Sequence, residues 1–300
     1  MFELKVKIQI AFFRAYNRIE RAVCPRNFTE RKETFPFVSC DSYALRCDFA
    51  LQRFVNEEEL DSELENMLAY SSIYLPTRFA ERASNYFLDR KKIFKKIVLG
   101  DDDKSLHEDA VKKISRATEK LYGINVYPNL HVMNPLPIGL ESPNYRSGGR
   151  LRDFSKRPNN SVNKRKLSFL VAWNQSTNIL KREIASLAFQ EAQDTFMTKK
   201  RIPAQVVHKL MRKSLFVPCP QGNGLDTHRI WETIFLGAVP VVLKQDAFSA
   251  LEGWPILFVE SWSEVTLLPR EELEEIYRSI IWDHEEVLEK SKDILKEIEA

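Results

Sequence analysis

The sequence lacks several features that would assign the chain to a class at once. No apolar run approaches the ~20 residues of a membrane-spanning helix, and no low-complexity segment or internal repeat occurs. No G-x-x-x-x-G-K-[ST] segment is present, which argues against a P-loop phosphotransferase. The formal net charge of +3 is too small to predict nucleic-acid binding.

Cysteine is scarce, and its spacing excludes the common metal and disulfide frameworks. The four cysteines are Cys24, Cys40, Cys47 and Cys219. No second pair and no histidine cluster accompanies Cys40 and Cys47 to complete a zinc site. We therefore expect no metal site, and reduced, partly buried thiols in a reducing compartment.

The remaining composition is that of an ordinary globular protein. The chain of 300 residues is long enough for one large or two medium domains. Its 44% hydrophobic and 29% charged residues are ordinary for a soluble globular protein.

One stretch, Ser214 to Leu243, predicts a strand–loop–helix–strand unit of parallel α/β type. A short apolar run, Leu215–Val217, is bounded by prolines and predicts a buried strand. The glycines of Gly222-Asn223-Gly224 permit a tight turn and let a ligand approach bare backbone. A helix follows, which Asp226 or Thr227 can cap.

The end of the same unit is equally regular. Gly237 suits the residue just past a helix C-terminus. Ala238 to Leu243 predicts a second buried strand.

The polar face of this helix carries a pattern suited to a nucleotide. At about 100° per residue, His228, Arg229 and Glu232 fall on the side opposite the apolar face. A helix N-terminus favours an anion, and Arg229 and His228 add donors for phosphate. Glu232, one turn deeper, can accept hydrogen bonds from two sugar hydroxyls, so the spacing predicts a nucleotide-sugar site. The alternative is a solvated i,i+3 ion pair on an ordinary α/β helix.

These residues also carry a family resemblance. The segment G-N-G-L-D-T-H-R-I-W-E-T-I-F-L-G-A-V-P-V-V resembles the donor-binding segment of exostosin-like glycosyltransferases, which have the GT-B fold. The resemblance covers Lys166 to Thr266. It implies that Glu232 holds the donor ribose, and that Arg229 and the Gly222–Gly224 loop hold the diphosphate.

The resemblance implies an α/β chain with two Rossmann-like domains facing each other across a cleft. Residues 1–155 would form the acceptor-side domain, and residues 156–300 the nucleotide-sugar-binding domain with a terminal helix that crosses back. The implied reaction moves a hexosyl or pentosyl group from a nucleotide-diphosphate sugar to a hydroxyl of a glycan or lipid-linked acceptor, as in polysaccharide biosynthesis. It would invert the anomeric carbon and need no metal or other cofactor.

A second donor-side element begins at Leu167–Trp173, which predicts the first strand of the second domain. Ser176, Thr177 and Asn178 follow it and can donate to oxygen atoms, while Lys181 or Arg182 can neutralise the diphosphate leaving group. N-capping of the next helix by Thr177 or Asn178 is an alternative that is compatible with this role.

Acceptor-side candidates lie upstream. Asp41 and Tyr43 follow a strand expected at Phe35–Ser39 and precede a helix expected through Phe49 and Leu51. A helix cap at Asp41 is the alternative.

Gly139 and Glu141 belong to a P-I-G-L-E segment that resembles the end of the acceptor half and would line the cleft. A proline-ordered loop between the domains is the alternative.

The run Asp101-Asp102-Asp103 follows a strand expected at Ile93–Gly100. We expect Asp101 or Asp102 to serve as the general base for the acceptor hydroxyl. A divalent-ion site and a helix cap are the alternatives.

Three further segments complete the expectations. Val111–Leu121 predicts an amphipathic helix, and Ser142–Asn163 a basic linker between domains. Residues 1–23 predict an edge strand and a helix, with a membrane-surface segment as the alternative. Because Lys5 and Lys7 interrupt the early apolar residues, this is not a secretory signal segment. We expect a cytoplasmic protein, with peripheral membrane contact as the option that the alternative would add.

A non-catalytic nucleotide- or glycan-binding protein of the same fold is the alternative function.

Overall fold

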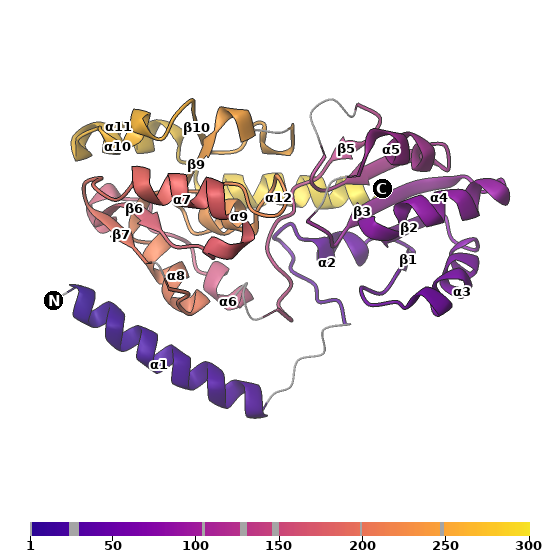
Figure 1. Ribbon diagram of the computed structural model, residues 1–300, viewed down its shortest axis with the longest axis horizontal. Coiled ribbons are helices and arrows are strands. Elements are labelled where there is room, and N and C mark those ends of the chain that lie inside the picture. The colour runs from indigo at the N-terminus through magenta and orange to yellow at the C-terminus, as the bar shows by residue number, and fades with distance from the viewer. Residues whose placement is uncertain are drawn as a thin grey trace.

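The computed structural model describes residues 2–23, 30–103, 106–126, 131–145, 150–198, 200–246 and 249–300. The chain is α/β, with two parallel five-stranded sheets. Figure 1 shows the first sheet and its helices in violet and the second in red and orange.

The first sheet has its strands in sequence order, β1-β2-β3-β4-β5, and all pairs are parallel. Its strands are β1 (Phe49–Ala50), β2 (Ser72–Pro76), β3 (Phe94–Gly100), β4 (Thr118–Gly123) and β5 (Asn134–Pro135). Its helices are α2 (Cys40–Ala44), α3 (Glu57–Met67), α4 (Ala80–Asp89), α5 (Glu108–Ser115) and the 3-10 turn η1 (Thr77–Phe79).

The second sheet has the order β10-β9-β8-β6-β7, again parallel throughout. Its strands are β6 (Leu167–Val171), β7 (Thr195–Met197), β8 (Ser214–Pro218), β9 (Val239–Leu243) and β10 (Leu257–Val259). Its helices are α6 (Leu151–Phe154), α7 (Ile179–Ala188), α8 (Ala204–Met211), α9 (His228–Phe235), α10 (Ser263–Thr266) and α11 (Arg270–Ile280). Its 3-10 turns are η2 (Val162–Lys164), η3 (Gln175–Thr177), η4 (Lys244–Asp246) and η5 (Ser249–Leu251).

The strand order of the second sheet creates a topological switch point. From β6 the chain crosses to β7 on one side, and it then returns to build β8, β9 and β10 on the other. The loops that leave β6 and β8 therefore diverge and leave a crevice between them. In open parallel sheets, ligands bind in this crevice at the carboxyl ends of the strands.

One apolar core joins the two sheets. It combines side chains from one face of each sheet with those of α2, α8 and α9 and of the final helix α12 (His284–Glu299). The end of α12 reaches the first sheet, where Tyr122 donates to Glu297 (3.0 Å) and Lys95 to the Ala300 carbonyl (2.7 Å). In Figure 1 this yellow helix extends from one half of the molecule into the other. The opposite faces of the sheets are covered by separate cores.

The sequence identified the buried strands better than the elements around them. The strands expected near Leu167, Leu215, Ala238 and Ile93 are present, because parallel strands buried on both faces read as continuous apolar runs. The strand expected at Phe35–Ser39 is wrong: this segment turns, and only Ser39 bridges to Gly139.

The reason for that error is the side chains around the turn. Thr34, Ser39 and Ser42 hydrogen-bond one another, and Thr34 also donates to the Phe37 carbonyl (2.8 Å). These side chains satisfy local polar groups that a strand would pair. The helix that follows is the short α2, and Phe49 begins β1 instead of continuing it.

Two other elements differ from expectation. The first helix, α1 (Phe2–Val23), has 22 residues and covers the whole stretch in which an edge strand and a helix were expected. The expected helix at Val111–Leu121 stops at Ser115, and Thr118 starts β4. The expected linker contains α6, whose Phe154 is buried; its residues 146–149 lie outside the described chain.

Gly237 gives the first prediction. It has a φ of +74°, and an added Cβ would lie 2.6 Å from the Arg165 guanidinium and from Pro158. Gly237→Ala should therefore lower the free energy of unfolding by more than the ~1–2 kcal/mol penalty of a left-handed residue. Gly253, with φ +67°, is the matched control, because its added Cβ meets only the flexible end of Lys290. Urea unfolding of both variants checks this, and equal losses would contradict the packing argument.

Candidate functional site

The candidate site lies at the switch point, between the loop after β6 and the loop after β8. Asn178, the N-cap of α7, accepts from the Lys181 backbone (3.3 Å) and donates to the Gly222 carbonyl (3.2 Å), which ties the two loops together. Ser176 is exposed, and its hydroxyl donates a hydrogen bond to the Asn174 side chain (3.1 Å). Asn178 therefore caps α7, as the alternative interpretation expected, and at the same time lies beside Gly222.

Arg182 is the unusual residue of the site. Its side chain is nearly buried, at 9% exposure; its guanidinium donates to the Asn174 carbonyl and lies 3.0 Å from where a Cβ on Gly222 would be. Burial, together with the nearby cation Arg229, lowers the pKa of Arg182 to about 10. Within the described residues no carboxylate pairs with it, and its buried Nε has no hydrogen-bond partner. A desolvated cation without a counterion favours an anionic ligand.

A cavity of about 830 Å³ opens beside this point. It lies at the ends of β6 and β7, between α8, α9 and the second half of α1. Its charged lining consists of the cations Arg14, Arg18, Lys200, Arg201 and Arg229, the carboxylates Glu20 and Glu232, and His208. The excess of cations gives the cavity a positive potential, which attracts anions.

Glu232 lines this cavity and lies in the middle of a series of charged contacts. Arg229 lies 2.9 Å from one carboxylate oxygen, and the His208 Nε2 lies 3.7 Å from the other. Asp153 contacts the opposite nitrogen of His208 at 3.1 Å. Burial alone would raise the pKa of Glu232, but Arg229 and His208 hold it below its ordinary value.

The Arg229–Glu232 pair is therefore an i,i+3 ion pair, as the alternative interpretation had it, but Glu232 is buried and not solvated. The pairing also changes the part expected of Arg229. Its guanidinium already contacts Glu232, so of the two neighbouring arginines Arg182 is the one without a carboxylate partner among the described residues.

A second cavity, of about 740 Å³, lies between the two halves of the protein, the first built on the sheet β1 to β5 and the second on the sheet β6 to β10. Thr77, Arg78, Asp102, Asp103 and Leu106 line it from the first half, and Asn178, Gly222 and Asn223 from the second. Thr177 lines both this cavity and the first one. Arg182 lines neither cavity, but its guanidinium contacts Asn174, which lines the first, and lies next to Gly222, which lines the second.

The glycine loop itself is used differently from expectation. A Cβ at Gly224 would lie 2.8 Å from the Asn125 side chain and closer still to the Asp103 carbonyl. Asn223 donates to Asp103 (2.9 Å). The close approach that Gly224 permits is thus to the first half of the protein, and only Gly222 and Asn223 face a cavity.

His228 and Asp226 also join the halves. His228 contacts the Gly139 carbonyl through Nδ1 (2.8 Å), so it faces the first half instead of a phosphate. Burial alone would lower the pKa of His228, but the carboxylate of Glu141 and the Gly139 carbonyl raise it. This contact brings Gly139 and Glu141 to the same junction as α9.

Asp226 does not cap α9, whose N-cap Thr227 makes no side-chain hydrogen bond. Its carboxylate accepts instead from the Ile138 backbone (2.7 Å) and the Trp231 indole (2.8 Å). Burial raises the pKa of Asp226 to about 7.

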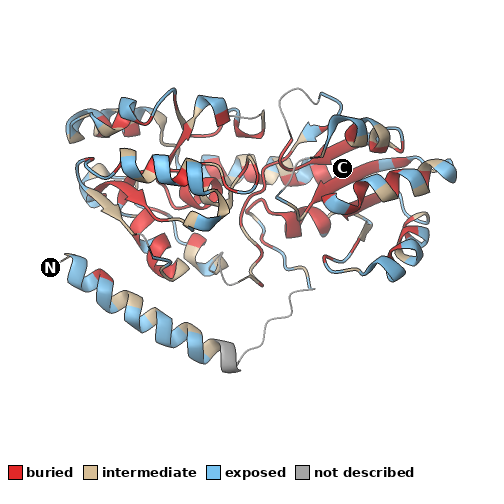
Figure 2. Ribbon diagram, in the orientation of Figure 1, coloured by how far each residue is buried: buried red, intermediate tan, exposed pale blue. Residues whose placement is uncertain are grey.

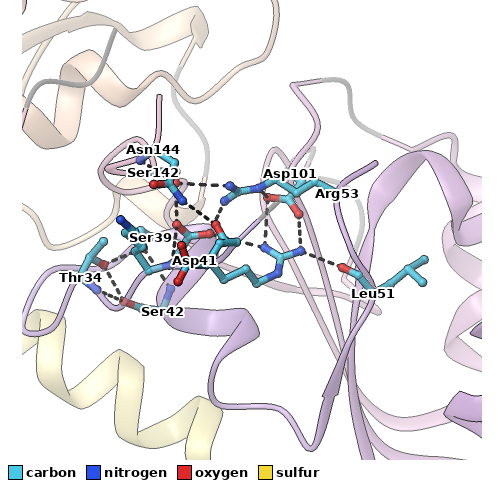
Figure 3. Close-up of polar contacts among 12 residues, drawn as sticks. Thr34, Ser39, Asp41, Ser42, Leu51, Arg53, Asp101, Ser142 and Asn144 are labelled. Atoms are coloured by element: carbon cyan, nitrogen blue, oxygen red, sulfur yellow. Dashed lines mark hydrogen bonds and ion pairs between the residues drawn. The ribbon is translucent and has the colours of Figure 1, made fainter. Parts of the chain in front are cut away.

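The acceptor-side aspartates form a buried network with two arginines (Figure 3). Asp101 contacts Arg31 (2.7 Å) and Arg53 (3.1 Å), and Arg53 also pairs with Asp41. Ser142 donates to Asp41 (2.6 Å). Burial alone would raise the pKa of Asp101, but the two guanidinium groups lower it.

These contacts disfavour the roles expected of three residues. Asp101 is a poor general base, because its lowered pKa weakens its affinity for a proton and both oxygens are engaged. Asp41 is fully buried, and Tyr43 is fully buried with its hydroxyl donating to the Pro137 carbonyl (2.9 Å). Asp102 lines the interdomain cavity, where it accepts from the Arg78 backbone and side chain (2.8 Å each).

His208, Asp153, Arg14 and Arg18 were not identified from the sequence. His208 lies in the mainly apolar segment V-V-H-K-L, and no motif in the sequence indicates that it belongs to a site. Its partners come from α6 and α9, so only the fold gives it a role. No group of three or more His, Cys, Asp or Glu that would suit a metal ion occurs in the part of the chain that the structure describes.

Asp226 gives a pH prediction with a definite sign. Its folded pKa of about 7 exceeds the ordinary 3.8, so the folded state binds this proton more tightly than the unfolded state. The stabilisation is complete below pH 3.8 and is lost as the pH rises toward 7. Urea unfolding from pH 4 to 7 should show this decline in the wild type and a flatter profile in Asp226→Asn. Parallel profiles for the two proteins would contradict the assignment.

Comparison with known proteins does not add a family. No protein-family model matches the chain, and no curated protein matches its sequence. The resemblance to exostosin-like glycosyltransferases over Lys166 to Thr266 therefore stays a prediction from the sequence.

Proposed function

We propose that this chain is a GT-B glycosyltransferase that moves a sugar from a nucleotide-diphosphate sugar to an acceptor hydroxyl. The observation that carries the proposal is Arg182, a buried cation without a carboxylate partner among the described residues, placed at the switch point of a parallel sheet. The motif that resembles exostosin-like enzymes occupies the same place. A glycan or glycolipid is the proposed acceptor class.

The cavities suggest where the diphosphate, the ribose and the base of the donor would lie. The diphosphate would lie beside Thr177 and Gly222, next to the Arg182 guanidinium. The ribose would extend toward Glu232, and the base into the rest of the larger cavity. Arg229 and His208 would then hold the Glu232 carboxylate ionised and oriented for the ribose hydroxyls.

The chemistry follows from this arrangement. The acceptor oxygen attacks the anomeric carbon, the bond from that carbon to the diphosphate oxygen breaks, and the electron pair leaves on the diphosphate. A fixed cation at Arg182 stabilises the charge that develops there. The hydroxyl proton passes to a carboxylate of the first half, for which Asp102 at the interdomain cavity is better placed than Asp101. A single displacement of this kind inverts the anomeric carbon.

One observation favours the second candidate, a protein that binds a nucleotide or glycan without catalysis. The carboxylates of Asp41 and Asp101 are locked by Arg31 and Arg53, and Asp102 is engaged by Arg78. If none of these groups accepts a proton, the donor would bind and no transfer would follow.

Calorimetric titration with a panel of nucleoside diphosphates tests the site. Arg182→Met should weaken binding about tenfold to a hundredfold, the usual effect of losing a charge-assisted hydrogen bond. The variant should keep its unfolding temperature, because an apolar side chain of similar length replaces a desolvated cation. Arg278→Met, at an exposed arginine of α11, is the control and should bind as the wild type does.

Inorganic diphosphate separates the two subsites. Glu232→Gln should weaken nucleoside diphosphates but not inorganic diphosphate, which has no ribose, whereas Arg182→Met should weaken both. Unchanged affinity of both variants would overturn the site. Tight donor binding with no nucleoside diphosphate released in the presence of acceptors would instead favour the non-catalytic alternative.

A further inference from the structure

The outer face of α1 carries an exposed apolar ridge, of which the member Tyr16 is contacted by Arg150, whose guanidinium donates to the Tyr16 hydroxyl (3.1 Å). Its exposed members recur every three or four residues, so they form one stripe along the helix. They include Leu4 (62% exposed), Ile8 (60%), Phe12 (61%), Tyr16 (38%) and Ile19 (66%). Helix α1 has 22 residues, which gives the stripe a length of about 33 Å at 1.5 Å per residue.

The opposite face of α1 fixes the direction of the ridge. Val6 is buried, and the Phe2 and Phe196 rings lie edge to face at 6.3 Å. Asn17 and Gln205 exchange hydrogen bonds of 3.3 and 3.0 Å. Figures 1 and 2 show the helix beneath the second half, with a largely exposed outer surface. Because these contacts hold the inner face against the protein, the ridge points outward.

The charges beside the ridge identify its partner. Among residues 2–20 the exposed charged side chains are Lys5, Lys7, Arg14, Arg18 and Glu3. At about 100° per residue, Lys7, Arg14 and Arg18 fall along one border of the ridge, between it and the packed face. An amphipathic helix with an apolar stripe and a basic border is suited to the headgroup region of an anionic bilayer. Two such ridges brought together in a dimer would instead set like charges near one another.

We propose that α1 lies flat in the interface of an anionic membrane, with its apolar ridge inserted and its basic border on the lipid phosphates. No described helix is long and apolar enough to cross a membrane. Arg14 and Arg18 line the larger cavity from the α1 side, so this orientation places that cavity beside the lipid headgroups. The inference stands independently of the proposed glycosyltransferase activity.

Vesicle co-sedimentation of the whole chain tests the proposal. Vesicles of phosphatidylcholine with phosphatidylglycerol should sediment the protein, and vesicles of phosphatidylcholine alone much less. The double variant Ile8→Glu/Phe12→Glu should reduce binding about tenfold or more, because it places charge in the inserted ridge. Lys7→Glu should weaken binding to the anionic vesicles. It should also make binding less sensitive to salt, because salt screens the attraction between the basic border and the lipid phosphates.

Leu267→Glu is the matched control. Leu267 is 82% exposed at the end of α10, which Figure 1 shows on the other side of the second half from α1, so its variant should bind vesicles as the wild type does. Circular dichroism checks that the α1 variant keeps its helices. Three results would overturn the proposal: no binding to either vesicle, equal loss in the control, or a wild-type dimer that the double variant converts to a monomer without vesicle binding. The last result would assign the ridge to a second copy of the chain.

Discussion

The structure depends on how charge is balanced at the carboxyl edge of the second sheet. Glu232 is compensated by Arg229 and His208, and His208 in turn by Asp153. Arg182 lies beside these groups, nearly buried, and has no carboxylate of its own within the described chain. The site is therefore positive by about one buried charge, which an anionic ligand would neutralise. The proposed donor position follows from that imbalance.

The two halves are held together at points that also shape the cleft. Helix α12 enters the shared core, while Gly224, Asp226 and His228 bind the loop after β8 to the first half. These contacts set the width of the interdomain cavity and the position of Gly222 within it. The same loop thus serves packing on one side and ligand access on the other. A residue such as Gly224 resembles part of a ligand loop in sequence although it serves packing.

The sequence predicted the parts of the fold that are encoded locally. Buried parallel strands are continuous apolar runs, and the left-handed position at Gly237 follows from the helix that it ends. The parts that failed depend on distant partners. The turn at Thr34 to Ser39 is held by hydroxyl groups, and His208 acquires its role only from Asp153 and Glu232. The ion pairs of Asp101 with Arg31 and Arg53, which span 70 and 48 residues, were equally invisible.

A crystal structure with a tightly bound nucleoside diphosphate would show where the phosphates of the nucleotide lie. We expect electron density for the diphosphate within hydrogen-bond distance of the Arg182 guanidinium, with the ribose hydroxyls on the Glu232 carboxylate. Phosphates bound only to Arg14, Arg18, Lys200 or Arg201, with Arg182 uncontacted, would contradict it.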